Sequence, residues 1–306
     1  MSHNNTKSKY WRYRVLMETV ISLIIFFISI NSGYALDWKN LHEEADRKSV
    51  EEAVRIQREY PDSSENLYVL GLCYLDKHMD KKANLVFKDL AAREPGLVEA
   101  RWGLAECLRR AHKLDESERM LKKIIREQPS FSPAYISLAY IKYTKMKFND
   151  SVRLAYKVIK QGKKNVDLTN YTRAYLMLAG AKGMIAHYGG PLSKAINGTF
   201  VFSKLKKAQR FSPQYAGVLF GMGSFYLLAP KFAGGNIHKA EDYLKKAIAA
   251  DPLFSDAYAR LSQVYQQKRD GKKAKFYLEK ALRIDSGSEL ALDIKSGRCK
   301  FICVTK

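Results

Sequence analysis

The sequence predicts an all-α protein, an α-solenoid of helix-turn-helix repeats. Small and large apolar residues recur every 34 residues, and proline follows the second helix of several copies. A period of this length is typical of units that stack side by side. The chain has 306 residues, of which 46% are hydrophobic and 27% charged, so it can bury a sizeable core.

The same residue types carry the period in each copy. Small residues stand where two helices must approach closely, large apolar residues stand between them, and proline stops the second helix. The first series is Leu70-Gly71, Tyr74, Ala83, Phe87 and Pro95. The second is Leu104-Ala105, Leu108, Ser117, Leu121 and Pro129, the third includes Leu138-Ala139, Ser151 and Ala155, and the last clear one is Leu261-Ser262, Tyr265, Ala274 and Leu278.

These motifs resemble the tetratricopeptide family over roughly residues 37–290. The resemblance implies an α-solenoid that serves as a protein- or peptide-binding scaffold, with no enzyme activity and no cofactor. The chain is therefore divided as follows: 1–35 signal peptide, 36–63 N-terminal capping helices, 64–165 three regular repeats, 166–254 two irregular repeats with enlarged turns, 255–290 a final repeat, and 291–306 a C-terminal tail.

The N-terminus indicates export. Four cations between Lys7 and Arg14 precede an apolar run from Val20 to Ile30, and small residues follow up to Ala35. This order is typical of a secretory signal peptide, here predicted to be cut after Ala35 in a periplasmic protein. The apolar run is too short to span a bilayer comfortably, and an uncleaved membrane anchor is the alternative.

Two neighbouring repeats depart from the regular spacing. Paired small residues of the two helices lie 12 apart in regular copies, but Gly223 and Ala240 lie 17 apart. The extra residues fall in APKFAGG, where Pro230 ends a helix, Gly234 and Gly235 permit unusual backbone angles, and Asn236 is a suitable N-cap. The preceding repeat has about ten extra residues around Gly189-Gly190-Pro191.

Both enlarged turns are expected to project from one edge of the solenoid, where loops often carry function. Drift without a role is the alternative. The predicted loop contacts are Pro230, Phe232, Gly234, Gly235, Gly189 and Gly190.

Residues 170–254 are also similar to the T-component proteins of tripartite ATP-independent periplasmic (TRAP) transporters. The likeness rests on the paired-glycine loop followed by KAEDYLKKAIAADP. It implies a periplasmic transporter component as the partner.

First-helix positions predict the concave groove, because in the repeat family these positions face a bound partner. Aromatic rings with arginine are common anchors for protein partners. Packing between repeats is the alternative for each single tyrosine. The predicted groove residues are Tyr68, Trp102, Arg109, Arg110, Tyr140, Tyr143, Phe220, Gln263 and Gln266.

The formal net charge of +22 allows a second hypothesis. Export argues against nucleic acid and redirects the charge towards an anionic envelope polymer or membrane surface. No catalytic or metal-binding motif is recognised, and His78 and His112, 34 apart in repeat turns, are expected to face solvent. Whether Cys299 and Cys303 form a disulfide stays open.

Overall fold

The computed structural model describes Met17 and residues 36–302, so the predicted signal cleavage after Ala35 lies outside the described residues. The described part forms fifteen α-helices and one 3-10 turn, without strands. They are α2 (Trp38–Ala45), α3 (Val50–Glu59), α4 (Ser64–Asp76), α5 (Asp80–Arg93), α6 (Val98–Arg110), α7 (Leu114–Glu127), α8 (Ser132–Thr144), α9 (Phe148–Gln161), α10 (Leu168–Tyr188), α11 (Pro191–Phe211), α12 (Ala216–Leu228), η1 (Lys231–Ala233), α13 (Ile237–Ala250), α14 (Ser255–Gln267), α15 (Gly271–Ile284) and α16 (Glu289–Ser296).

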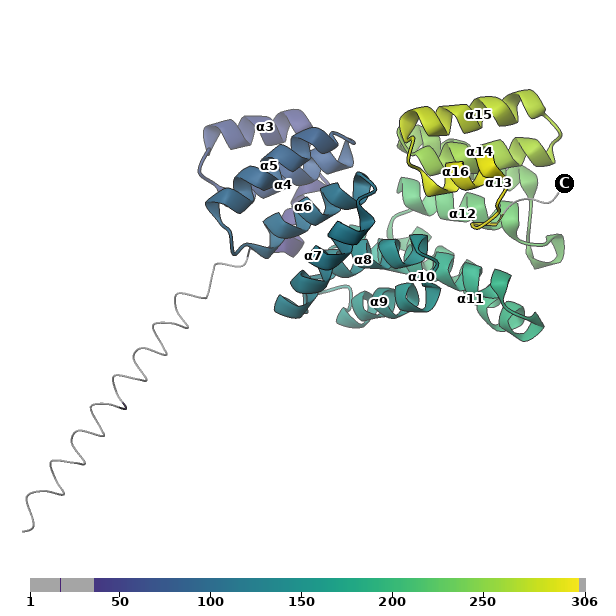
Figure 1. Cartoon of the computed structure of the whole chain (residues 1–306), viewed down its shortest axis with the longest axis horizontal. Coiled ribbons are helices and arrows are strands. Elements are labelled where there is room, and N and C mark those ends of the chain that lie inside the picture. Colours follow the sequence, from purple (N-terminus) through teal and green to yellow (C-terminus); the bar gives the residue numbers. More distant parts are fainter. Residues whose placement is uncertain (1–16, 18–35, 303–306) are drawn as a thin grey trace, which may run out of the picture.

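The helices pair into antiparallel hairpins that stack along an arc, which confirms the predicted all-α solenoid (Figure 1). The first helices α4, α6, α8, α10, α12 and α14 each contact the next one in this series. They form the inner wall, and the second helices α5, α7, α9, α11, α13 and α15 form the outer one. Within the described residues, no helix is both long and apolar enough to cross a membrane.

Small residues let neighbouring helices approach around large apolar ones. The fully buried ring of Phe87 lies between Gly71 and Gly103, whose Cβ atoms, if present, would stand 2.6 Å and 2.3 Å from it. Ala83 and Ala105 are also fully buried. The period in the sequence is therefore the period of helix-to-helix contact.

The longer of the two insertions extends two helices. The ten or so extra residues around Gly189-Gly190-Pro191 were expected to form a projecting loop. Instead, α10 and α11 have 21 residues each and meet at a tight turn. Pro191 occupies the first turn of α11, where a missing N–H costs nothing. The insertion thus projects as a helical hairpin.

The shorter insertion forms the η1 turn, and the expected N-cap is confirmed. The Asn236 side chain accepts hydrogen bonds from the backbone N–H groups of His238 and Lys239, at 3.1 and 3.0 Å. Gly234 has a φ of +99°, in the left-handed region that favours glycine. A Cβ on Gly235 would lie 1.9 Å from the carbonyl oxygen of Ala229.

The two solenoid ends touch through two matched histidine–aspartate hydrogen bonds that we call the clasp. His78 Nε2 lies 3.0 Å from Asp251 Oδ2, and His112 Nε2 lies 2.9 Å from Asp285 Oδ1. Both histidines lie in turns inside repeats, and both aspartates lie in turns between repeats. Because each pair of positions is 34 apart, the two contacts repeat in register. The expectation that these histidines face only solvent was wrong.

Arg110 supports the first clasp pair. Its guanidinium donates to Asp80 Oδ1 at 2.6 Å and to His78 Nδ1 at 3.0 Å. Because arginine can only donate, His78 Nδ1 accepts, and its Nε2–H points to Asp251. Arg110, predicted as a groove residue, therefore acts in the clasp.

The Gly235→Ala variant should lose about 1–3 kcal/mol of unfolding free energy, because the new methyl group meets backbone that cannot move aside. Chemical denaturation measures this. Gly190→Ala is the matched control, since nothing lies within 4 Å of a Cβ there. Equal stability of both variants would contradict the tight packing of the η1 turn.

The clasp predicts a pH dependence. The hydrogen bond to Asp285 raises the pKa of His112 above its ordinary 6.5, so the stabilisation is complete below 6.5 and is lost as pH rises through the raised value. Burial alone would raise the pKa of Asp285, but the bond from His112 outweighs it and lowers the pKa below 3.8. The stabilisation from Asp285 is therefore present above pH 3.8 and is lost as the pH falls through the lowered pKa.

The His112–Asp285 pair should therefore stabilise the fold most between about pH 4 and 6.5. Denaturation at a series of pH values, with X-ray scattering for compactness, compares the wild type with Asp285→Asn. The difference in stability between them should shrink as pH rises above 6.5. A constant difference across this range would show that the pair does not titrate as proposed.

Candidate binding groove

The N-terminal half of the inner groove holds the chain's own helix α2, which lies against α4. Trp38 packs edge-on against Phe131 with ring centroids 5.4 Å apart, and His42 lies 5.3 Å from the Trp102 ring. The His42 Nε2 atom is 2.9 Å from the Tyr68 hydroxyl. Tyr68 and Trp102, two predicted groove residues, are buried beneath this helix.

Helix α2 is fixed to the middle of the solenoid as well. The Asn170 amide of α10 lies 3.4 Å from His42 Nδ1, and the Thr169 hydroxyl donates to Asp46 at 2.6 Å. Burial lowers the pKa of His42, which keeps its ring neutral and able to both donate and accept. This half of the groove is therefore a packed core.

A buried polar network follows along α6 and α8. Arg109 donates two hydrogen bonds to Glu106, at 2.9 and 2.7 Å, and its guanidinium lies 4.4 Å from the centre of the Tyr140 ring. Ser137 donates to the same carboxylate at 2.7 Å. Burial opposes ionisation of Glu106, but the Arg109 charge outweighs it and holds the pKa of Glu106 well below its usual range. The pair stays charged, which fixes Arg109 over Tyr140.

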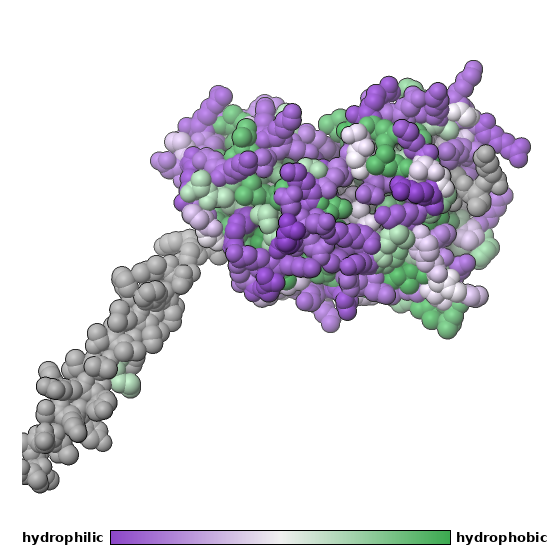
Figure 2. Space-filling model, in the orientation of Figure 1, coloured by the Kyte–Doolittle hydropathy of each residue, from purple (hydrophilic) through white to green (hydrophobic). Residues whose placement is uncertain are grey.

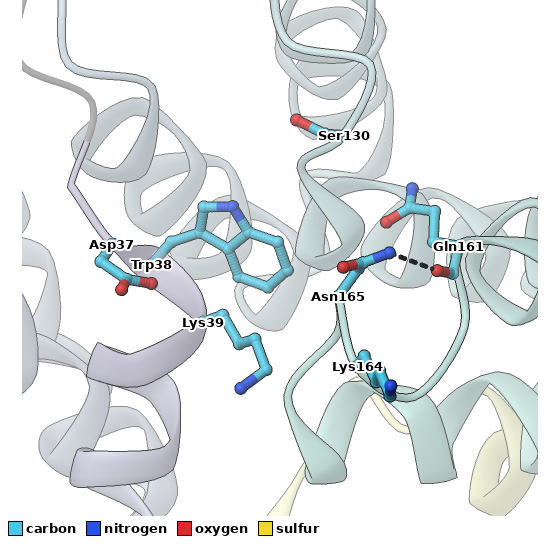
Figure 3. A pocket seen from close by; sticks show the side chains of 7 residues that line it. All are labelled: Asp37, Trp38, Lys39, Ser130, Gln161, Lys164 and Asn165. Carbon is cyan, nitrogen blue, oxygen red and sulfur yellow. Dashed lines mark hydrogen bonds between the residues drawn. The ribbon is translucent and has the colours of Figure 1, made fainter.

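A hollow of about 450 Å³ opens beside the start of α2 (Figure 3). The side chains of Trp38 and Lys39 face Gln161 and Asn165 across it, and Asn165 donates to the Gln161 carbonyl at 2.9 Å. Its lining also includes Asp37, Ser130 and Lys164. Apart from Trp38, the residues that line the hollow have polar or charged side chains.

The C-terminal half of the groove holds the chain's own tail, residues 297–302. Arg260 on α14 donates to the carbonyl oxygens of Phe301 and Ile302, at 2.7 and 2.9 Å. Gln263 donates to the Ile302 carbonyl at 3.4 Å. The buried ring of Phe301 stacks on Tyr143, with centroids 5.8 Å apart and planes 17° apart.

The other side of the tail is held from α16. The Asp293 carboxylate accepts the backbone N–H groups of Lys300 and Phe301, at 2.9 and 2.8 Å. The Tyr188 hydroxyl donates to the Lys300 carbonyl at 2.7 Å. The chain is thus bound mainly through its backbone, with one aromatic side chain in a pocket. Cys299 is disulfide-bonded, while Cys303 lies outside the described residues.

The predicted groove residues divide into separate sites. Tyr68 and Trp102 hold α2, Arg109 and Tyr140 form the central network, and Tyr143 and Gln263 contact the tail. Phe220 instead packs on Phe254, with centroids 5.0 Å apart. Gln266 is exposed at the end of α14.

The predicted loop residues lie at the edge where the two insertions end. Pro230, Phe232, Gly234 and Gly190 are exposed there, while Gly189 and Gly235 are half-buried.

Three residues that hold the tail escaped the sequence prediction: Arg260, Asp293 and Tyr188. Arg260 replaces the small or aliphatic residues Val69, Gly103 and Ser137 found at the same repeat position, and it is buried. A charged residue at a buried repeat position was an available signal, because burying a charge requires partners. Asp293 lay beyond the last recognised repeat and carried no such signal.

Trp102→Ala should lower the free energy of unfolding by about 3–5 kcal/mol, because the indole packs against three buried rings, one of which is His42 of α2. Urea denaturation measures the loss. Leu85→Ala, at a side chain that is 66% exposed, is the control and should change stability by less than about 0.5 kcal/mol. A Trp102→Ala variant as stable as the control would show that α2 does not seal this half of the groove.

A family profile described as tetratricopeptide repeat matches residues 81–139 and 231–296. No curated protein matches by sequence.

Several solved structures share the fold. A tetratricopeptide repeat protein from Parabacteroides merdae is 12% identical with a TM-score of 0.51, over 84% of this chain and 98% of that chain. A monomeric mutant of IFIT1 with m7Gppp-AAAA is 13% identical with a TM-score of 0.54, over 83% of this chain and 64% of that chain. Cut9-Hcn1 from the APC/C is 13% identical with a TM-score of 0.51, over 81% of this chain and 51% of that chain. The chain thus shares the α-solenoid fold of these structures, and two stretches of it match the tetratricopeptide repeat profile.

Proposed function

We propose that this chain is an exported scaffold that binds an extended segment of a protein partner in the C-terminal half of its groove. One observation carries the proposal. The groove already binds a peptide, its own tail, through Arg260, Gln263 and Asp293.

The chemistry of this site suits an extended backbone. Arg260 presents two donors to consecutive carbonyl groups, and Asp293 accepts from consecutive N–H groups. Such contacts do not depend on side chains, so a foreign segment could make them too. Tyr143 then adds selectivity, because it stacks an aromatic ring from the bound segment. We expect a partner segment with an aromatic residue at that place.

The tail is easier to exchange than α2. Among the tail residues described, only Phe301 is buried, whereas α2 buries Trp38, Leu41 and His42. Burying the Phe301 side chain contributes about 2 kcal/mol to the binding of the tail. A partner segment that makes more contacts can therefore displace it. The site is therefore occupied in the free chain and available by competition.

The partner follows from the predicted location. The signal-like N-terminus places the chain in the periplasm in this proposal, and the similarity to T-component proteins makes a periplasmic transporter component the first partner class to test. The scaffold role requires no catalytic group in the groove.

The test releases the tail in the full chain. Phe301→Ser should weaken the hold of the tail on the groove, so that a labelled peptide RSKFISVTK, which is residues 298–306 with serine at both cysteines, can bind. Its affinity for the variant should exceed that for the wild type by up to roughly thirtyfold, because the variant tail lacks the buried ring and competes more weakly. Fluorescence anisotropy measures this, and the peptide with serine in place of phenylalanine is the control. The second variant, Phe301→Ser with Tyr143→Leu, should lose the peptide.

Capture from envelope extract then tests the partner. A true partner is enriched by Phe301→Ser and lost with the double variant. Equal peptide binding to the wild type and to Phe301→Ser, or a captured protein that ignores both changes, would refute the proposed site.

A further inference from the structure

The outer face of α11 carries an apolar strip. Leu192, Ile196 and Phe200 are 73%, 52% and 43% exposed. Their spacing of four residues places them on one face of the helix. They lie on the part of the hairpin lengthened beyond the regular repeat. Figure 2 shows hydrophobic side chains gathered at the lower right, where Figure 1 places the end of this hairpin.

The η1 turn adds a fourth exposed apolar side chain. Phe232 is 94% exposed. The turn is fixed to α11 through Phe225, whose ring lies 4.9 Å from Phe202 of that helix and within 3.8 Å of where a Cβ on Gly234 would stand. We call Leu192, Ile196, Phe200 and Phe232 the apolar edge. A rigid scaffold thus presents large apolar side chains from two adjoining elements, which is costly unless something covers them.

The sequence that supplies the apolar edge carries charge of one sign. No aspartate or glutamate occurs between Asp167 and Glu241. The same stretch contains nine cations: Arg173, Lys182, Lys194, Lys204, Lys206, Lys207, Arg210, Lys231 and Lys239. The Lys204 ammonium lies 5.5 Å from the centre of the Phe200 ring. Lys206 and Lys207 are exposed further along α11, and Lys231 adjoins Phe232.

We propose that the apolar edge docks on an anionic lipid surface. The apolar side chains would enter the boundary between headgroups and acyl chains, while the lysines meet lipid phosphates. A second copy of this chain is disfavoured, because it would bring the same cations against one another. The four residues of the apolar edge are distinct from Arg260, Asp293 and Tyr188, which hold the tail.

Hydrogen–deuterium exchange of the full chain tests the docking. The probes are vesicles of equal parts phosphatidylglycerol and phosphatidylcholine, with pure phosphatidylcholine as the neutral comparison. Peptides covering residues 191–203 and 230–235 should be protected only by the anionic vesicles, and protection should weaken in high salt. This mapping separates the apolar edge from any binding by residues 1–35.

The variant Leu192→Ser/Ile196→Ser/Phe200→Ser should lose that protection, and the vesicle concentration needed for half-maximal protection should rise on the order of tenfold or more. Leu85→Ser/Phe276→Ser is the control, because these apolar side chains are also more than half exposed, at 66% and 54%, but lie on other helices. It should behave as the wild type. Loss of vesicle binding with normal peptide binding in the groove separates this proposal from the preceding one.

Three outcomes would overturn the proposal. They are no protection at the apolar edge, protection confined to residues before 36, and protection without vesicles that disappears on dilution. The last would assign the edge to self-association. Equal protection by neutral vesicles would also reject the role of the lysines.

Discussion

Each helical hairpin of this chain has an apolar face that it can bury only against another element, and the rest of the structure follows from that constraint. Neighbouring hairpins satisfy it along the solenoid, as Phe87 does between Gly71 and Gly103. The inner wall has no neighbouring hairpin, so another segment has to cover it. In this chain the covers come from its own ends: α2 lies on one half of the wall and the tail on the other.

The two segments that cover the groove are held by different contacts, so the two halves of the groove differ in how easily their occupant can be replaced. Trp38 and His42 pack into a cluster of aromatic rings, and His42 also hydrogen-bonds to the Tyr68 hydroxyl, as in a protein core. The tail is held by hydrogen bonds to its backbone and by one stacked ring. Backbone bonds can be remade by another peptide, whereas an aromatic cluster is specific to the side chains that form it. Partner exchange is therefore concentrated near Arg260.

The repeat was predictable because it is local. Spacings of 12 and 34 residues place Ala83 and Phe87 in a hairpin without any knowledge of distant contacts. The N-cap at Asn236 was predictable for the same reason. The clasp was not, because each histidine meets an aspartate 173 residues away, and that distance in space depends on the summed curvature of the intervening repeats. The two segments that occupy the groove could not be predicted either, because α2 and the tail lie outside the repeats that form its wall.

The insertion around Gly189-Gly190 was expected to form a loop but extends two helices, for a physical reason that also bears on function. Spacing alone shows that residues are added, but not whether they form a loop or extend the helices. Residues 182–188 and 192–202 contain few helix breakers, so both helices continue until Gly189-Gly190, and the insertion becomes a rigid hairpin.

A loop could fold its apolar side chains back on the solenoid. A straight helix holds Leu192, Ile196 and Phe200 outward, and the acid-free sequence around them leaves the lysines available to an anionic surface. One solenoid can in this way present a peptide site on its inner wall and a separate docking edge outside it.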